Sequence, residues 1–259
     1  MDLGIARRTA LVAASSAGLG RACATALARE GCTVIVNGRD EARLQSARAA
    51  IADETGATVI ALRADLGDRA GRDALLAAAA EVDILVTNNG GPAPGRFLDW
   101  DEAVWLEAVE ANMLSAIMLI RGVLPGMRAR RFGRIVNITS AMVKSPQLPM
   151  ALSTAARSGL TAFAKALSRD VAGDNVTVNN LLPERIDTAR LRSMTERLAA
   201  HRGLSFDDAR AEMLKPVPAR RFGTPDEFGQ ACAFLCSAGA GYITGQNLQV
   251  DGGSYEGLI

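Results

Sequence analysis

The sequence predicts one α/β domain, a doubly wound parallel sheet of about seven strands with helices on both faces. Short β-type runs alternate with longer helical patterns along all 259 residues. Runs such as "ILVT" and "RIVNI" are apolar without alternation, which is typical of strands buried on both faces. No repeat, linker or low-complexity segment divides the chain, so we expect residues 1–259 to form a single domain.

The first half of the chain supplies four of the expected strands. We assign them to "TALVAA", "CTVIVN", "ATVIAL" and "DILVTN". Helical patterns separate these strands at residues 18–30, from Asp40 onward, and near 68–80. Strand followed by helix, repeated in this way, favours parallel pairing through crossover helices.

The second half continues the same alternation. Helices are expected through residues 101–130 and from about 149 to 172, around the strand "GRIVNIT". The strands "VTVNNLL" and "NLQVDGG" follow. A charged helical insertion at about 187–217 separates these last two strands, and we predict that it forms a lid over a substrate.

Composition excludes several classes of partner. The chain carries a formal net charge of +1, so no basic excess suits nucleic acid. We find no continuous membrane-spanning apolar run and expect no membrane partner. The four cysteines lack a metal-binding spacing and the chain has one histidine, so we expect no metal, core thiols and a cytoplasmic, reducing location.

A glycine loop follows the first strand. Residues 13–22 read "AASSAGLGRA" and lead directly into a helix. This arrangement places a pyrophosphate at a helix N-terminus, with Gly18 and Gly20 allowing close approach and Ser16 adding a hydroxyl. A tight strand-to-helix turn without a ligand remains the alternative.

The ends of the next strands indicate which nucleotide would bind. An acidic side chain after the second strand would repel a 2′-phosphate, but the sequence has Asn37 and Arg39 there. We therefore expect NADP rather than NAD. Asp65 is placed to meet the adenine edge, and Gly90 offers a close backbone beside the ribose.

Taken together, these residues resemble the short-chain dehydrogenase/reductase family over nearly the whole chain. The family's TGxxxGxG falls on residues 13–20 and its NNAG on 87–90, and "RFGTPDEFGQACAFLCSAGAGYITGQNLQVDGG" is close to its C-terminal pattern. The resemblance implies a Rossmann-like domain similar to 3-oxoacyl-carrier-protein reductases. It also implies cofactor contacts from Ser16, Gly18, Leu19, Gly20, Asn37, Arg39, Asp65, Leu66, Asn88, Asn89, Gly90, Pro183, Ile186 and Thr188.

The departures from the family pattern fall on the chemistry. Ala14 stands at the first glycine of the loop, and "PE" replaces the family's PG at Pro183. The family's YxxxK motif falls on Ser153 and Arg157. A serine hydroxyl is a far weaker acid than a phenol, and arginine stays charged near neutral pH.

The resemblance gives five candidate catalytic residues: Ser140, Ser153, Arg157, Asn112 and Lys144. Lys144 lies on the loop that overhangs the substrate pocket in the family, where an ammonium could stabilise an oxyanion; a solvated loop lysine without a catalytic role is the alternative. Two roles stay open for Arg157, namely contact with a ligand, or filling space and pairing with a carboxylate such as Glu184. Of the two tyrosines, we expect Tyr242 to pack inside the fold and Tyr255 to reach a site only from a neighbouring subunit.

The expected function is NADP(H)-linked interconversion of a carbonyl and an alcohol on a small-molecule substrate, in an atypical active site. The open alternatives are a lyase, an isomerase, a dehalogenase-like enzyme, or a nucleotide-binding protein without catalysis. The family resemblance implies a homodimer or homotetramer. The lid arginines Arg190, Arg192, Arg197 and Arg202 fit an acidic substrate or a solvated helix equally well.

Overall fold

A seven-stranded parallel sheet is the centre of the computed structural model, which describes residues 2–79 and 81–258. The strand order is β3-β2-β1-β4-β5-β6-β7, which confirms the doubly wound sheet that the sequence predicts. Each neighbouring pair runs parallel. The strands are β1 (Thr9–Val12), β2 (Thr33–Gly38), β3 (Val59–Arg63), β4 (Ile84–Thr87), β5 (Gly133–Ile138), β6 (Val176–Pro183) and β7 (Asn247–Val250).

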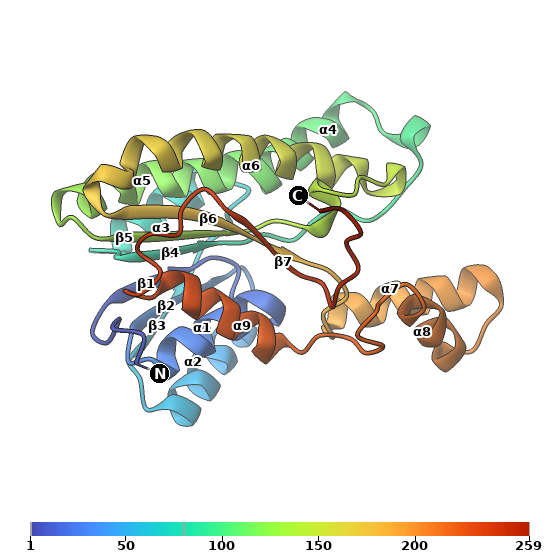
Figure 1. Cartoon of the computed structure of the whole chain (residues 1–259), viewed down its shortest axis with the longest axis horizontal. Coiled ribbons are helices and arrows are strands. Elements are labelled where there is room, and N and C mark those ends of the chain that lie inside the picture. Colours follow the sequence, from blue (N-terminus) through green and yellow to red (C-terminus); the bar gives the residue numbers. More distant parts are fainter. Residues whose placement is uncertain (1, 80, 259) are drawn as a thin grey trace.

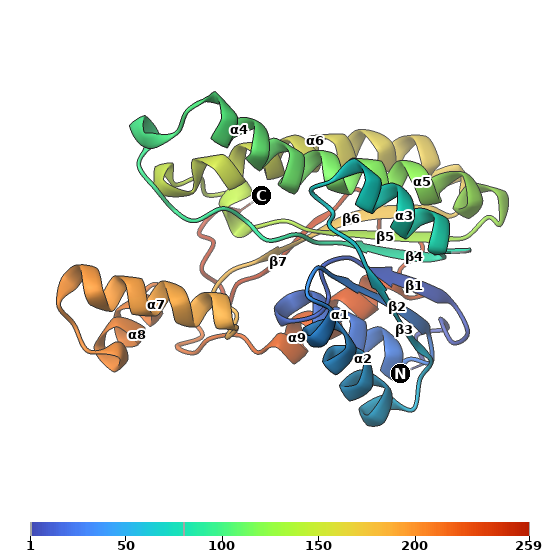
Figure 2. The ribbon, with the colours of Figure 1, turned by 180° about the vertical axis from the view of Figure 1, so that it is seen from behind.

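Helices cover both faces of the sheet (Figures 1 and 2). One layer consists of α1 (Gly18–Arg29), α2 (Glu41–Thr55) and α9 (Pro225–Cys236). The other layer consists of α3 (Arg69–Ala78), α4 (Glu102–Val109), α5 (Ser115–Ala129) and α6 (Ala151–Val171). Two separate apolar clusters fill the spaces between the sheet and these layers.

Side-chain caps define where several helices begin. Asp40, Asp68 and Asp101 each accept backbone N–H groups of the first turn of α2, α3 and α4. At α9, Thr224 and Glu227 form a reciprocal capping box. The expected end of the third helix near residue 80 lies outside the described residues.

The insertion between β6 and β7 forms two helices, α7 (Ala189–Arg202) and α8 (Phe206–Leu214), which pack on each other. They lie beyond the carboxyl end of β6, to the side of the sheet (Figure 1). The strand order reverses between β1 and β4, and ligands of such sheets bind outside the carboxyl ends of the strands at this point. The insertion therefore stands beside the expected binding crevice.

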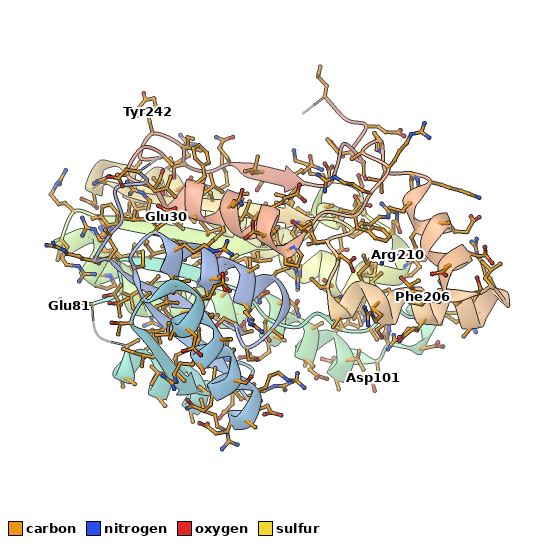
Figure 3. The ribbon with its side chains drawn as sticks, turned by 90° about the horizontal axis from the view of Figure 1, so that it is seen from below. Glu30, Glu81, Asp101, Phe206, Arg210 and Tyr242 are labelled. Atoms are coloured by element: carbon orange, nitrogen blue, oxygen red, sulfur yellow. The ribbon has the colours of Figure 1, made fainter. Side chains whose placement is uncertain are left out.

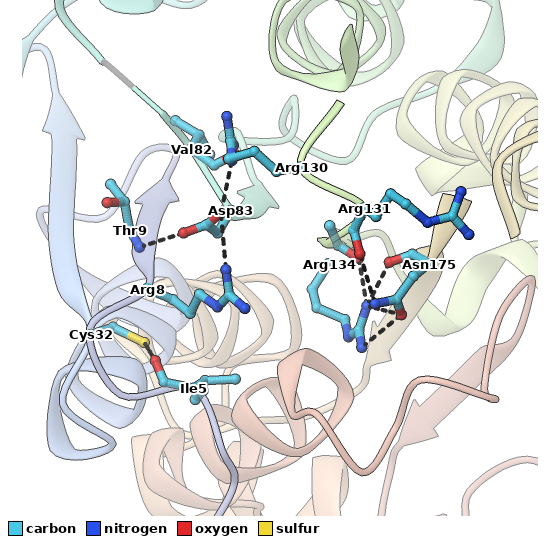
Figure 4. A network of polar contacts seen from close by, with 11 residues as sticks. Ile5, Arg8, Thr9, Cys32, Val82, Asp83, Arg130, Arg131, Arg134 and Asn175 are labelled. Carbon is cyan, nitrogen blue, oxygen red and sulfur yellow. Dashed lines mark hydrogen bonds and ion pairs between the residues drawn. The ribbon is translucent and has the colours of Figure 1, made fainter. Parts of the chain in front are cut away.

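A polar network closes the opposite, amino-terminal edge of the sheet (Figure 4). The carboxylate of Asp83, just before β4, accepts hydrogen bonds from the Thr9 backbone and from Arg130, and pairs with Arg8 at 3.6 Å. Arg134 is 1% exposed, and its guanidinium donates to backbone carbonyls and lies over the Phe132 ring. Arg134 is therefore satisfied inside the protein, whereas Arg8 and Arg130 are partly exposed and pair with the buried carboxylate of Asp83.

The stretch Glu102–Ala129 is continuous helix and contains the π-helical segment η2 (Glu110–Leu114) between α4 and α5. By length and composition it is the one described stretch that could cross a membrane. Its α5 part packs on β4, β5, α3 and α6. Core helices of globular proteins pass the same test, so this is weak evidence for a membrane span.

Candidate functional site

The loop between β1 and α1 keeps its tight turn although Ala14 replaces the expected glycine. Ala14 adopts φ 44°, a conformation that usually favours glycine. Its N–H donates to Asn37 Oδ1 at 3.2 Å, and its carbonyl accepts from Asn88 Nδ2 at 3.2 Å. A Cβ on Gly20 would stand 2.5 Å from that carbonyl, so glycine is required there.

Asn37, an expected cofactor residue, has a side chain that is bonded within the protein. Its side chain is fully buried and donates to the carbonyls of Leu62 and Ala64 at 3.1 and 3.2 Å. Together with its bond to Ala14, these contacts use the whole amide to join the ends of β1, β2 and β3. A buried amide needs such partners, and the sequence pattern does not show where they lie.

Arg39 is the exposed cation at the end of β2. It lies 3.5 Å from Asp65, and the two side chains are 78% and 51% exposed, so this ion pair is weak. Asp65 also caps its own turn by accepting from the Gly67 N–H. Ser16 lies beside Gly38, because a Cβ there would meet its hydroxyl at 3.0 Å. Arg39 and Ser16 thus flank the same strand end.

A cleft joins the start of α1 to the start of α7. Its lining includes Gly18, Arg21, Thr188 and Ala189, so two expected cofactor residues from distant parts of the chain meet here. The first turn of α1 has no acidic residue and no side-chain cap, which leaves its N–H groups free for an anion. Thr188 accepts from the Leu191 N–H and caps α7.

The remaining expected cofactor residues also lie near the carboxyl ends of the strands or at the start of α1, and several of them contact the rest of the protein. Leu66 and Ile186 are buried, and Leu19 packs against the core beside α1. Pro183 ends β6. Asn89 and Gly90 follow β4, and Asn89 Nδ2 donates to the Ala111 carbonyl at 3.0 Å.

The π-helical segment η2 positions Asn112. Its Oδ1 accepts from Arg157 Nε at 3.1 Å, and its Nδ2 donates to the Gly90 carbonyl at 3.5 Å. Because a π-helical turn changes the backbone bonding pattern, the Ala111 carbonyl can accept from Asn89. The segment therefore connects the β4 loop to α6.

The guanidinium of Arg157 donates its hydrogen bonds to other groups of the protein. Besides Asn112, it donates to the carbonyls of Thr139, Ile138 and Asn89. Burial, reinforced by the positive charge of Arg190, lowers its pKa to about 10, so it stays charged at neutral pH. Glu184 pairs with Arg185 instead, so the alternative pairing of Arg157 with Glu184 is wrong.

Two serines stand where the family motifs fall. Ser140 follows β5, and its Oγ accepts from the Met142 N–H at 3.2 Å, which leaves its own hydroxyl hydrogen free to point elsewhere. Ser153 is 6% exposed and lies in the first turn of α6, one turn before Arg157. Both serines lie where the sequence predicts them, Ser140 after the fifth strand and Ser153 in the helix that follows.

Arg190 lies beside Arg157 and Ser153, although it is not among the site residues expected from the sequence, where it counts only as one of the lid arginines. It lies in the first turn of α7 and donates to the carbonyls of Gly91 and Pro92 at 3.0 and 3.2 Å. A Cβ on Gly91 would stand 3.4, 3.5 and 3.6 Å from Arg190 Nη2, Arg157 Nη2 and Ser153 Oγ. The only feature of the sequence that could have indicated this placement of Arg190 is its position two residues after Thr188, an expected cofactor residue.

Both tyrosine expectations are wrong. The ring of Tyr255 lies 5.1 Å from Lys144 Nζ in the same chain, so no neighbouring subunit is needed to bring it to this loop. Tyr242 is fully exposed, far from Phe206 and Arg210 on α8 (Figure 3). The sequence does not show that the C-terminal tail folds back toward the loop after β5.

Sequence comparison places the chain among known reductases. A family model described as enoyl-(acyl carrier protein) reductase matches residues 13–255. The 3-oxoacyl-[acyl-carrier-protein] reductase of Escherichia coli is 36% identical over 252 residues, with 96% of this chain and 97% of that protein covered. Acetoacetyl-CoA reductase of Allochromatium vinosum is 33% identical over 96% of this chain and 98% of that protein.

Solved structures agree with this placement. L-sorbose reductase from Gluconobacter frateurii, complexed with NADPH and L-sorbose, superposes with a TM-score of 0.95 at 29% identity, with both chains fully covered. Actinorhodin polyketide ketoreductase with NADPH gives a TM-score of 0.91 at 31% identity, covering 96% of this chain and 97% of that chain. With the sheet order, the glycine loop and the C-terminal pattern, these likenesses show that the chain belongs to the short-chain dehydrogenase/reductase family.

Proposed function

We propose that this protein is an NADP(H)-dependent oxidoreductase that interconverts a carbonyl and an alcohol on a small molecule in an atypical active site. The observation that carries the proposal is the end of β2, where Arg39 is exposed and an acidic residue is missing. A cation there suits a 2′-phosphate. The similar structures of L-sorbose reductase and polyketide ketoreductase contain NADPH.

The residues present fit a dinucleotide. A Cβ on Gly18 or Gly90 would meet nothing within 4 Å, so both glycines face open space at the crevice. Gly18 would receive the pyrophosphate at the start of α1, and Gly90 would lie under the nicotinamide ribose. Arg39 and Ser16 would hold the 2′-phosphate. When bound, the reduced cofactor supplies a hydride to the substrate carbonyl.

Ser140 is the proposed hydrogen-bond donor to the reacting oxygen. Its Oγ already accepts from the Met142 backbone, which orients the side chain and leaves the hydroxyl hydrogen available for a substrate. Ser153 cannot deliver a proton as a phenol does, and Arg157 keeps its proton at neutral pH. We assign oxyanion stabilisation to Lys144, with solvent as the source of the proton.

Exposed apolar side chains and buried cysteines support two further proposals, on the assembly and on the cellular compartment. The helical stretch Glu102–Ala129 leaves apolar side chains exposed, among them Leu106 at 61%. We propose that a second copy covers this face in a homodimer or homotetramer. All four cysteines are buried free thiols, which supports a reducing, cytoplasmic location.

The test is cofactor binding followed by turnover. At a concentration one hundred times the dissociation constant, NADPH is expected to stabilise the protein by about 2.7 kcal/mol in thermal denaturation, and NADH by less. Arg39→Ala is expected to remove the preference for NADPH. No stabilisation by either nucleotide contradicts the proposal, and binding without turnover on a panel of ketones and alcohols favours a non-catalytic nucleotide-binding protein.

The double variant Ser153→Tyr with Arg157→Lys tests the atypical site. It restores a phenol and a lysine at the family positions, so we expect carbonyl reduction to appear or rise in a folded variant that still binds NADPH. Unchanged activity would show that the pocket is not arranged for hydride transfer.

A further inference from the structure

Two positive charges and no negative one lie beside Gly91. Arg157 and Arg190 reach it from α6 and α7, and Ser153 adds a hydroxyl. Among the described residues no carboxylate lies within 4.0 Å of either guanidinium. The hydrogen-bond acceptors of both arginines are neutral carbonyls and the Asn112 amide.

Arg134 shows that a guanidinium without a carboxylate can be structural. It is 1% exposed, its nitrogens are taken by carbonyls and the Asn175 amide, and it lies over the Phe132 ring at 4.5 Å. No ligand can reach it. The arginines beside Gly91 differ because Arg190 is exposed and its neighbour is a second cation rather than a ring.

Arg190 also retains donor capacity. Its two terminal nitrogens each make one bond, to Gly91 and Pro92, although each carries two hydrogens. Within the described part of the chain its Nε has no acceptor. A guanidinium with free N–H groups at a solvent-accessible position matches a carboxylate well.

We propose that Arg190, supported by the charge of Arg157 and the hydroxyl of Ser153, binds a carboxylate of the substrate at Gly91. This rests on the proposed function and specifies its substrate class: a small oxo acid, or the corresponding hydroxy acid. Ser153 stands at the position that aligns with the family's proton donor, so an anion at Gly91 lies next to the reacting carbonyl. The carboxylate is therefore only a few bonds from that carbonyl.

A phosphate group of the cofactor is a less suitable occupant. The pyrophosphate site proposed above is at the start of α1, and the proposed 2′-phosphate site is at Arg39. Gly91 instead lies in the loop after β4, against the first turns of α6 and α7. The positive charge beside it is therefore available to a second molecule.

The experiment compares acids with their methyl esters on protein saturated with NADPH. Pyruvate, acetoacetate and levulinate place the carboxylate at increasing distance from the ketone, and binding is measured by calorimetric titration. We expect at least one acid to bind roughly 10- to 100-fold more tightly than its ester, because the ester lacks the charged hydrogen-bond acceptor. Equal binding of acid and ester, or no binding of any acid, overturns the proposal.

Arg190→Gln is expected to weaken binding of that acid by roughly the same factor and to leave NADPH binding unchanged. Arg192→Gln removes an equal charge from the same helix and is expected to change neither. Gly91→Ala keeps every charge but adds a methyl group against Arg190, Arg157 and Ser153, so it should also weaken binding of the acid. Inorganic phosphate that displaces the acid with equal affinity would overturn the assignment to a carboxylate.

The two proposals fail separately. Loss of NADPH binding in the unmodified protein contradicts the proposed function. Normal NADPH binding with equal acid and ester affinities contradicts only the carboxylate site.

Discussion

The arginines at the amino-terminal edge of the sheet, where the strands begin, have different partners from those at the carboxyl edge, where the strands end. At the amino-terminal edge the buried carboxylate of Asp83 lies between the partly exposed side chains of Arg8 and Arg130, so that charges of opposite sign meet there (Figure 4). At the carboxyl edge Arg157 and Arg190 adjoin each other, with no carboxylate within 4.0 Å in the described residues. One edge is complete without a ligand, and the other keeps an unbalanced positive charge.

This difference separates stability from function. Removing one partner of a buried ion pair is costly because the other charge is left alone. An arginine without a counter-ion contributes no such pair energy, and it raises the cost of burial for its neighbour. The lowered pKa of Arg157 reflects both burial and the nearby charge of Arg190. We infer that the carboxyl edge gives up some stability to hold an anion.

The largest expected effect is at the amino-terminal edge. Asp83→Asn leaves two guanidiniums without their carboxylate, and we expect the free energy of unfolding to fall by about 2–3 kcal/mol. Urea denaturation measures this change. Asp170→Asn is the matched control, because its pair with Arg128 is 3.4 Å long and exposed, and its effect should stay below about 0.5 kcal/mol. Equal effects of the two variants would remove the contrast between buried and exposed pairs.

A carboxylate added at the other edge should act in the opposite direction. Gly91→Asp places an anion beside Arg190 and Arg157, and we expect it to raise the free energy of unfolding by about 1 kcal/mol relative to Gly91→Asn. Asparagine has nearly the same shape as aspartate but no charge, so the comparison separates the effect of the charge from the effect of adding a side chain. If the Gly91→Asp protein were less stable than the Gly91→Asn protein, the region around Gly91 would not have an unbalanced positive charge.

The smallest effect belongs to the exposed pair at the start of α9. Hydrogen bonds from Arg221 and from the Thr224 backbone lower the pKa of Glu227 to about 2, below its ordinary value of 4.5. A carboxyl whose pKa falls on folding stabilises the protein above its unfolded pKa and loses that contribution as pH falls toward its folded pKa.

Glu227→Gln should therefore lower Tm slightly at pH 7, and the difference from the unmodified protein should narrow as pH falls below 4.5. Salt should reduce the same difference, because the pair is exposed. A difference that is independent of pH would assign the whole effect to the capping box rather than to charge.

The sequence predicts the strands, the two helical layers and the position of the glycine loop, because apolar patterning and glycine spacing are local signals. It does not predict the contacts of Asn37, since the carbonyls that bind its amide lie in β3 and directly after it. The same holds for Arg190, which reaches Gly91 from 99 positions along the chain. Tyr255 near Lys144 is a third such contact made only by folding. Patterns locate elements, and tertiary contacts decide what a polar side chain does.

The central claim is that the carboxyl edge holds a substrate carboxylate with Arg190. A crystal structure with NADPH and the tightest-binding oxo acid tests it most directly. We predict the carboxylate within hydrogen-bond distance of the Arg190 guanidinium beside Gly91, with the ketone oxygen toward Ser140. An ordered acid whose carboxylate lies away from Arg190, with the bonds from Arg190 to Gly91 and Pro92 unchanged and no anion beside them, would contradict the claim.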